Sequence, residues 1–185
     1  MTDISLAPQP PAPPPAPFIV TAELPTDVLG WADGLRRAHF PPERNHLAAH
    51  VTLFHAFAPT LREELRGLLA QLAGEYRAPA ARIEGLFDLG RGTALAIHSP
   101  AMLALREAIA GHFHGSLTAQ DSHVPRLHIT IQNKVTPQEA RALQARLGPA
   151  LLPRDFAFSG LGLHLYRQPY WEPQGIWRFR GKVDG

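Results

Sequence analysis

Alternating apolar and polar positions predict the strands of this chain, and apolar stripes at helical spacing predict its helices. Strands are expected at residues 17–24, 50–57, 81–90, 93–99, 126–135, 154–168 and 175–183. Helices are expected at residues 26–40, 61–76, 100–115 and 136–149. Thr26 or Asp27 is the expected cap of the first helix. Thr136, Pro137 and Glu139 form a capping-box start for the last one.

The order of the predicted elements repeats along the chain. A strand, a helix, a strand, a helix and a strand are followed by the same five elements and one further strand. A short turn around Arg91 and Gly92 separates the two halves. This internal duplication predicts an α+β fold in which two lobes of sheet and helix face each other across a cleft.

One strand in each half carries the same polar pair. "HVTL" begins at His50, and "HITI" begins at His128, 78 positions later. Side chains alternate along a strand, so His50 shares a face with Thr52, and His128 shares a face with Thr130. His55 is expected on the opposite face, with the aliphatic neighbours. Both strands are therefore expected to bury one face in the core and to line a cleft with the other.

These two pairs suit phosphodiester chemistry that needs no metal. A histidine, with a reference pKa of about 6.5, can act near neutral pH as a base on a hydroxyl or as an acid toward a leaving oxygen. Threonine hydroxyls can donate hydrogen bonds to the non-bridging phosphate oxygens, where charge must be stabilised. A single H-x-T is a weak signal, since an isolated strand histidine is more often structural. The second copy makes a catalytic pair the preferred interpretation.

The same motifs carry a family resemblance. The two strands, with "PPERNHLAAHVTLFHAF" around the first, resemble the 2H phosphoesterase superfamily over residues 18–183, in particular its bacterial 2′-5′ RNA ligase-like (RNA 2′,3′-cyclic phosphodiesterase) branch. The resemblance implies a bilobal α+β fold of antiparallel sheets related by a pseudo-two-fold axis, with helices outside and a metal-independent central cleft. It implies substrates that carry a 2′,3′-cyclic phosphate or a 2′-5′ linkage. As catalytic residues it carries over only His50, Thr52, His128 and Thr130.

Four further residues are candidate substrate contacts. Arg126 precedes the second motif, and Lys134 is expected on the same strand face as His128, so both are candidates for binding phosphate. Tyr166 and Arg167 lie close to further aromatic residues where the last strands meet. This group could hold a nucleobase by stacking, with ordinary packing against the sheet as the alternative.

Two other functions fit the residues. The same cleft could bind RNA or a nucleotide without catalysis, and binding would then weaken with salt while no turnover is seen. A metal-dependent hydrolase built on the ten histidines would lose activity to a chelator and regain it with zinc. Bell-shaped pH dependence and indifference to chelators would instead favour the paired-histidine enzyme.

Composition narrows the class of protein. Of the 185 residues, 45% are hydrophobic and 18% are charged, which is typical of a folded globular domain. The absence of cysteine excludes disulfides and thiolate metal sites. Sixteen of the 18 basic residues are arginines, the side chain best suited to bidentate phosphate contacts, although the net charge is only +2.

The ends of the chain and its composition also predict its organisation. Residues 1–17 are rich in proline and are expected to form a disordered tail, whereas residues 18–185 are expected to form a single domain with interleaved lobes. No secretory signal and no run of about 18 apolar residues is present, so we expect a cytoplasmic protein. We expect a monomer with no cofactor and no obligate protein partner. It would act on RNA termini or on small cyclic or 2′-5′ nucleotides.

Overall fold

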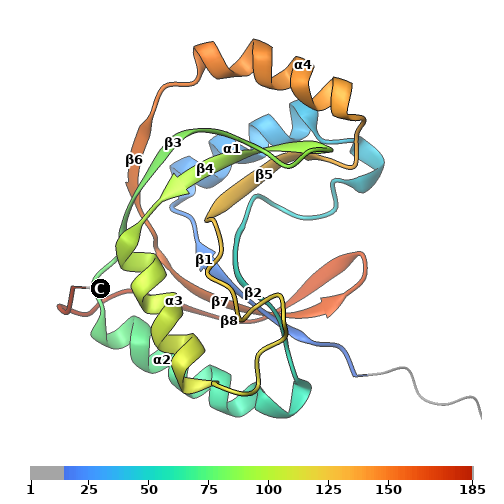
Figure 1. The fold of residues 1–185 in the computed structure, drawn as a ribbon. Helices are drawn as coiled ribbons and strands as arrows, with labels where there is room; N and C mark the ends of the chain where they lie inside the picture. Colours follow the sequence, from blue (N-terminus) through green and yellow to red (C-terminus); the bar gives the residue numbers. More distant parts are fainter. Residues whose placement is uncertain (1–14, 185) are drawn as a thin grey trace, which may run out of the picture.

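Two four-stranded antiparallel sheets organise residues 15–184, the part of the chain that this computed structural model describes (Figure 1). The first sheet has the strand order β2 (Val51–Phe57), β1 (Phe18–Glu23), β7 (Gly160–Arg167) and β8 (Tyr170–Arg178). The second has the order β5 (His128–Asn133), β4 (Gly92–His98), β3 (Ala80–Asp88) and β6 (Arg154–Ala157). The predicted α+β fold with two antiparallel lobes is confirmed. The first 14 residues of the predicted tail lie outside the described residues.

Helices connect the strands and cover the sheets. The described residues contain α1 (Thr26–His39), α2 (Arg62–Glu75), α3 (Pro100–His112) and α4 (Pro137–Leu147), and short 3₁₀ turns at Pro42–Arg44, Pro59–Leu61 and Gly148–Ala150. α2 packs against β7 and β8 of the first sheet, and α4 packs against β3 and β4 of the second (Figure 1). α1 follows β1 in the chain but packs against β5 of the second sheet. This crossing ties the two lobes together.

The two sheets have equivalent strands in equivalent places. β1 and β4 each lie beside the H-x-T strand that follows them in the chain, β2 or β5. Both H-x-T strands are therefore edge strands, and β2 contacts β5. The sheets do not correspond to the two halves of the chain, because β3 joins the second sheet while β7 and β8 return to the first.

Two strand boundaries differ from the sequence prediction. The predicted strand 154–168 is two strands, because the chain leaves the second sheet at Phe158, whose ring is fully buried, and enters the first sheet at Gly160. The last strand, predicted at 175–183, begins at Tyr170 because it forms a hairpin with β7. The continuous apolar pattern of residues 154–168 thus gave no indication that the chain passes from one sheet to the other within it.

Capping residues predicted one helix start correctly and the other wrongly. The Thr136 hydroxyl accepts a hydrogen bond from the Glu139 backbone, and the Glu139 carboxylate accepts one from the Thr136 backbone at 2.8 Å, which is the predicted capping box of α4. α1 instead has Pro25 at its N-cap, with no side-chain cap. Asp27 lies in the first turn of α1, where a carboxylate suits the helix dipole, and its oxygen is 4.0 Å from Nη1 of Arg154.

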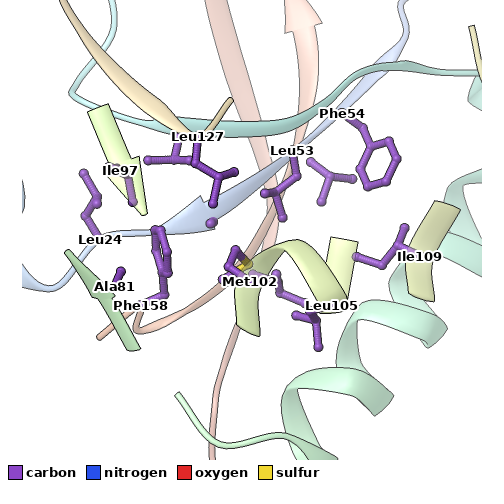
Figure 2. Close-up of a cluster of buried hydrophobic side chains, with 14 of the residues drawn as sticks. Leu24, Leu53, Phe54, Ala81, Ile97, Met102, Leu105, Ile109, Leu127 and Phe158 are labelled. Atoms are coloured by element: carbon purple, nitrogen blue, oxygen red, sulfur yellow. The ribbon is translucent and has the colours of Figure 1, made fainter. Parts of the chain in front are cut away.

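One buried hydrophobic cluster includes side chains from both sheets (Figure 2). Its members include Leu53 and Phe54 of β2, Ile97 of β4, and Met102 and Leu105 of α3. Separating these side chains would expose their apolar surface to water, which is unfavourable, so the cluster holds its members together. The core therefore keeps the H-x-T strand of the first sheet in a fixed relation to the second sheet.

Candidate active site

Each H-x-T strand has a β-bulge directly after its threonine. In the first sheet, Thr52 and Phe54 pair with consecutive residues of β1, so the residue between them has no partner. In the second sheet, Thr130 and Gln132 pair with consecutive residues of β4 in the same way. A bulge bends a strand and re-aims its side chains, and bulges are frequent beside active sites. The first bulge also interrupts the alternation, so His55 is exposed and does not lie with the buried Val51 and Leu53.

The two motif histidines make the same backbone contact. Nδ1 of His50 is 2.8 Å from the carbonyl oxygen of Ala48, and Nδ1 of His128 is 2.7 Å from that of Arg126. A carbonyl oxygen can only accept, so Nδ1 carries the hydrogen in both rings. Nε2 is then the nitrogen left for proton transfer in each neutral ring. Each imidazole is thus oriented by a hydrogen bond to the backbone carbonyl two residues before it, and the two histidines form a matched pair.

The surroundings of His50 keep its ring neutral. Burial is the largest of the effects that lower its pKa to about 4, and the positive charges of Arg36, His164 and His128 lower it further. The hydrogen bond to Ala48 acts in the opposite direction but is outweighed. His50 is therefore an unprotonated base at neutral pH. Because the charge of His128 acts on His50, the two motif histidines lie within electrostatic reach of each other.

The motif threonines are half-buried on the two edge strands. Within residues 15–184, neither Thr52 nor Thr130 uses its hydroxyl in a hydrogen bond to another protein group. The backbone carbonyl of Thr130 does have a partner, because it accepts a hydrogen bond from Arg36 Nη1 at 2.7 Å. Both hydroxyls are thus available to a ligand, while the backbone beneath Thr130 is held in place.

Arg36 of α1 connects the two motif segments from a buried position. One amino group donates to Thr130 on β5, and the other donates to Oδ1 of Asn45 at 2.8 Å, in the segment that leads to β2. Its guanidinium also lies over the ring of Phe40, 4.4 Å from the centroid. The guanidinium therefore ties α1, β5 and the approach to β2 together.

α3 carries an equivalent buried arginine in the other lobe. Arg106 donates a hydrogen bond to the backbone carbonyl of Asp121 and lies over the ring of Phe54, 4.5 Å from the centroid. The Asp121 carboxylate in turn accepts hydrogen bonds from the backbone of His55 and Ala56 on β2. Arg36 on α1, the helix before β2, thus holds β5. Arg106 on α3, the helix before β5, holds β2 through Asp121.

A cavity of about 230 Å³ opens beside His50. Part of its wall is a hydrogen-bond chain in which the Thr21 hydroxyl donates to the Glu23 carboxylate at 2.6 Å and lies 3.0 Å from Nε2 of His164. Since the single hydrogen of Thr21 goes to Glu23, Nε2 of His164 must donate to the Thr21 oxygen. The ring of Trp171 lies 4.5 Å from that of His50 and 5.7 Å from that of His164, centroid to centroid.

This chain of hydrogen bonds keeps a negative charge beside the cavity. Burial alone would raise the pKa of Glu23, but the nearby His164 imidazole, 3.8 Å away, and the hydrogen bond from Thr21 outweigh it and lower the pKa, so the carboxylate is ionised at neutral pH. Gly162 lies opposite Thr21 on β7, and a methyl group there would overlap the space that Glu23, Thr21 and His164 occupy. A glycine is therefore required at this position for the three side chains to meet.

Comparison with known proteins identifies the family. The family model of the 2′-5′ RNA ligase superfamily matches residues 24–169. The chain belongs to this superfamily. No curated protein matches the sequence.

Solved structures show the same fold at low sequence identity. TT0787 of Thermus thermophilus is 16% identical, and the alignment covers 90% of this chain and 100% of that one with a TM-score of 0.63. LigT of E. coli complexed with 3′-AMP is 17% identical, with 89% of this chain and 98% of that one covered and a TM-score of 0.59. LigT complexed with NADP+ is 16% identical over the same shares, with a TM-score of 0.58.

The structure does not bring the four predicted substrate-contact residues of this superfamily member together in one place. The Arg126 guanidinium lies over the ring of Phe87, 4.1 Å from the centroid, just before His128. Lys134 lies beyond the far end of β5, in a separate hollow. Tyr166 is 37% exposed near the end of β7.

Arg167, the fourth predicted substrate contact, already has a partner within the protein. Its Nε is 3.3 Å from a carboxylate oxygen of Glu172, across the β7–β8 hairpin. Both side chains are more than half exposed, so this ion pair is weak.

Sequence reasoning missed four polar residues around the two motifs. Thr21 and Glu23 alternate along "FIVTAEL" as the H-x-T pairs do, and this polar face was a detectable signal. His164 alternates with leucines in "LGLHLYR" in the same manner. Arg36 gave no signal, because its helix position alone does not distinguish it from the exposed Arg37.

Two kinds of feature are absent from the described part of the chain. No helix within residues 15–184 is long and apolar enough to cross a membrane. The same residues contain no group of three or more histidine, cysteine, aspartate or glutamate side chains that could hold a metal ion.

Proposed function

We propose that this member of the 2′-5′ RNA ligase superfamily is a phosphoesterase that hydrolyses 2′,3′-cyclic phosphates or cleaves and forms 2′-5′ linkages, with His50 and His128 as its acid–base pair. The matched backbone contacts of the two histidines carry this proposal, because they leave Nε2 free on both rings. The lowered pKa of His50, which keeps its ring neutral, supports His50 as the base of the pair. His128 is then the acid.

Opening a cyclic phosphate requires one proton to be taken and another to be given. Neutral His50 accepts a proton from water as the water oxygen attacks phosphorus. The bond from phosphorus to one ribose oxygen breaks, and that oxygen takes the Nε2 proton of His128, which enters this step protonated on both ring nitrogens. The hydroxyls of Thr52 and Thr130 donate to the non-bridging oxygens, which carry increased charge in the transition state. After this step His50 carries an additional proton and His128 has lost one, and proton exchange with solvent restores both. In ligation a 5′-hydroxyl takes the place of the water while the two histidines keep their roles. Cleavage of a 2′-5′ linkage is that reaction in reverse, with the roles exchanged.

The cavity beside His50 supports a binding role in the same reaction. We place the nucleobase or ribose of the substrate against Trp171, with the Glu23 carboxylate of the same cavity as a further contact. Tyr166 of β7 is placed at its edge, because it pairs with Trp171 across the hairpin. Arg126 is placed beside the phosphate because it lies shortly before His128 in the chain. Flat aromatic surfaces accept any base, so this arrangement supports nucleotide binding more than sequence readout.

Single substitutions test the mechanism. His50→Ala and His128→Ala should each lower kcat for a 2′,3′-cyclic nucleotide by about 10²- to 10⁴-fold, the usual contribution of general acid–base catalysis, while thermal unfolding remains cooperative. His123→Ala, an exposed histidine outside the site, is the matched control and should turn over normally. Near-native activity in both motif variants would falsify the mechanism.

The alternatives predict different results in the same assays. A non-catalytic RNA- or nucleotide-binding module would bind oligonucleotides in a salt-dependent manner and show no turnover above background. A metal-dependent hydrolase would lose activity to EDTA and regain it with zinc. Turnover that is indifferent to EDTA and requires both histidines supports the proposal over both alternatives.

A further inference from the structure

A second, strongly basic hollow lies outside the site around His50. Arg44, Arg91, Asn133 and Lys134 line a volume of about 290 Å³. They come from three separate places: the 3₁₀ turn before β2, the turn between β3 and β4, and the end of β5. Three cationic side chains from distant parts of the chain thus line one hollow.

The positive charge of this hollow is largely uncompensated. Among the described residues, no carboxylate oxygen lies within 4.0 Å of Arg91 or Lys134, and Arg44 reaches only its neighbour Glu43 at that limit. All three basic side chains are exposed. Exposed like charges repel one another, so an anionic ligand is the natural partner of this surface.

The acidic groups on the neighbouring elements are already engaged. The Asp88 carboxylate accepts hydrogen bonds from the Gly90 backbone at 2.7 Å and from Gln144 at 3.1 Å. The Glu139 carboxylate closes the capping box of α4. These groups are held in local hydrogen bonds rather than in ion pairs with the hollow.

The backbone around the hollow is fixed in an unusual conformation. Lys134 has φ of +59°, the left-handed region that costs a non-glycine residue roughly 1 kcal/mol. The side chain of Asn133 accepts a hydrogen bond from the Lys134 backbone at 2.7 Å, and Arg91 Nε donates to the carbonyl of Val135 at 3.1 Å. Gly92 is needed opposite, because a side chain there would collide with the backbone of β5. Contacts between the β3–β4 turn and the end of β5 thus fix the backbone that forms the hollow.

The length of β5 sets the distance between this hollow and the catalytic pair. Lys134 lies six positions after His128, and a strand rises about 3.3 Å per residue, so the separation is roughly 20 Å. A stacked nucleic-acid strand advances about 3.4 Å per phosphate, so roughly six nucleotides span this distance and fewer suffice when the strand is stretched. A mononucleotide held at His50 and His128 does not reach the hollow.

We propose that Arg44, Arg91 and Lys134 form a phosphate subsite for an RNA strand, so that the enzyme prefers an oligonucleotide terminus to a small cyclic nucleotide. This inference rests on the proposed phosphoesterase function and adds the size of its substrate. A strand bound through one reacting phosphate and one remote phosphate gains affinity in a length-dependent and salt-dependent way.

A series of substrates with terminal 2′,3′-cyclic phosphates tests the subsite. For the wild type, kcat/KM should rise about tenfold or more between the mononucleotide and an oligonucleotide of about ten nucleotides, with the rise complete near six. The double variant Arg91→Gln/Lys134→Gln should lose most of this preference, and its salt dependence on the long substrate should be shallower by about 0.7 in the log–log slope for each phosphate that it no longer binds. Arg82→Gln is the control, because Arg82 is an exposed arginine at the opposite side of the second sheet, paired with Asp155.

The outcomes separate this inference from the proposed function. Equal kcat/KM for short and long substrates in the wild type, with turnover intact, would overturn the subsite and leave the phosphoesterase in place. If no substrate is turned over, the proposed function fails, and the affinity of a fluorescent single-stranded RNA still decides the subsite. Equal affinity for the wild type and the double variant in that binding assay would overturn it.

Discussion

His50 and His128 occupy matching positions, yet different groups surround them. His50 contacts Trp171 and lies within reach of two other positive charges, whereas the ring of His128 meets Phe87 edge-on at 5.6 Å. The repeated H-x-T pattern identified both residues and treated them as equal. Their division into base and acid depends on neighbours such as Arg36 that the pattern does not contain. At this scale the chemistry of a residue is a property of its surroundings.

The pH dependence of catalysis follows from this difference. Because His50 acts as a base and its pKa is lowered to about 4, kcat/KM for a 2′,3′-cyclic nucleotide should remain high on the acid side until the pH approaches about 4. Steady-state kinetics across the pH range, with circular dichroism at each pH to confirm folding, measures this limb. An acid limb near the ordinary histidine value of about 6.5 would assign the base elsewhere.

Among the elements, α1 and α3 have a role that their own amphipathic patterns do not reveal. α1 packs against β5 of the other lobe and presents Arg36 to the backbone of Thr130. α3 presents Arg106 to Asp121, whose carboxylate binds the backbone of β2. The helices therefore position the motif strands as well as cover apolar surface. The sequence predicted that these helices exist, but not the strands that they contact.

Replacement of Arg36 should disturb both the fold and the site. Arg36→Met leaves the Thr130 carbonyl and the Asn45 side chain without a donor, so unfolding in urea should show a loss of about 2–4 kcal/mol. The variant also lacks one of the charges that lower the pKa of His50, so the acid limb of kcat/KM should shift to higher pH. Arg37→Met, at the exposed neighbouring position, is the control. A loss of stability without a shift of the limb would assign Arg36 a purely structural role.

At the scale of the whole molecule, the two sheets exchange strands and share one core. β3 leaves the first half of the chain for the second sheet, and β7 and β8 return to the first. An isolated half would therefore lack part of its sheet and part of its hydrophobic cluster. The protein is therefore expected to unfold as one unit, so protonation of a residue in the site, such as His50, should change the free energy of unfolding of the whole molecule.

The stability of the protein should fall in mildly acidic solution because of His50. Its pKa is about 4 in the native state and about 6.5 when unfolded, so between these values the unfolded state binds the additional proton and stability decreases as the pH falls. Relative to His50→Asn, the wild type should lose up to about 3 kcal/mol more of its free energy of unfolding between pH 7 and pH 4. Urea denaturation of both proteins at the two pH values measures the difference. Parallel losses would show that the native pKa of His50 is close to its ordinary value.

The sequence by itself determined the elements, the duplication and the four motif residues, because these depend on local periodicity and on a pattern that occurs twice. It also predicted the start of α4, whose capping box involves residues three positions apart. Only the tertiary structure decided that the apolar run 154–168 divides between two sheets. It alone brought Arg36 beneath Thr130 and three distant basic residues into one hollow. Burial and charge at a site are sums over neighbours that chain folding brings together, and local sequence patterns do not contain those neighbours.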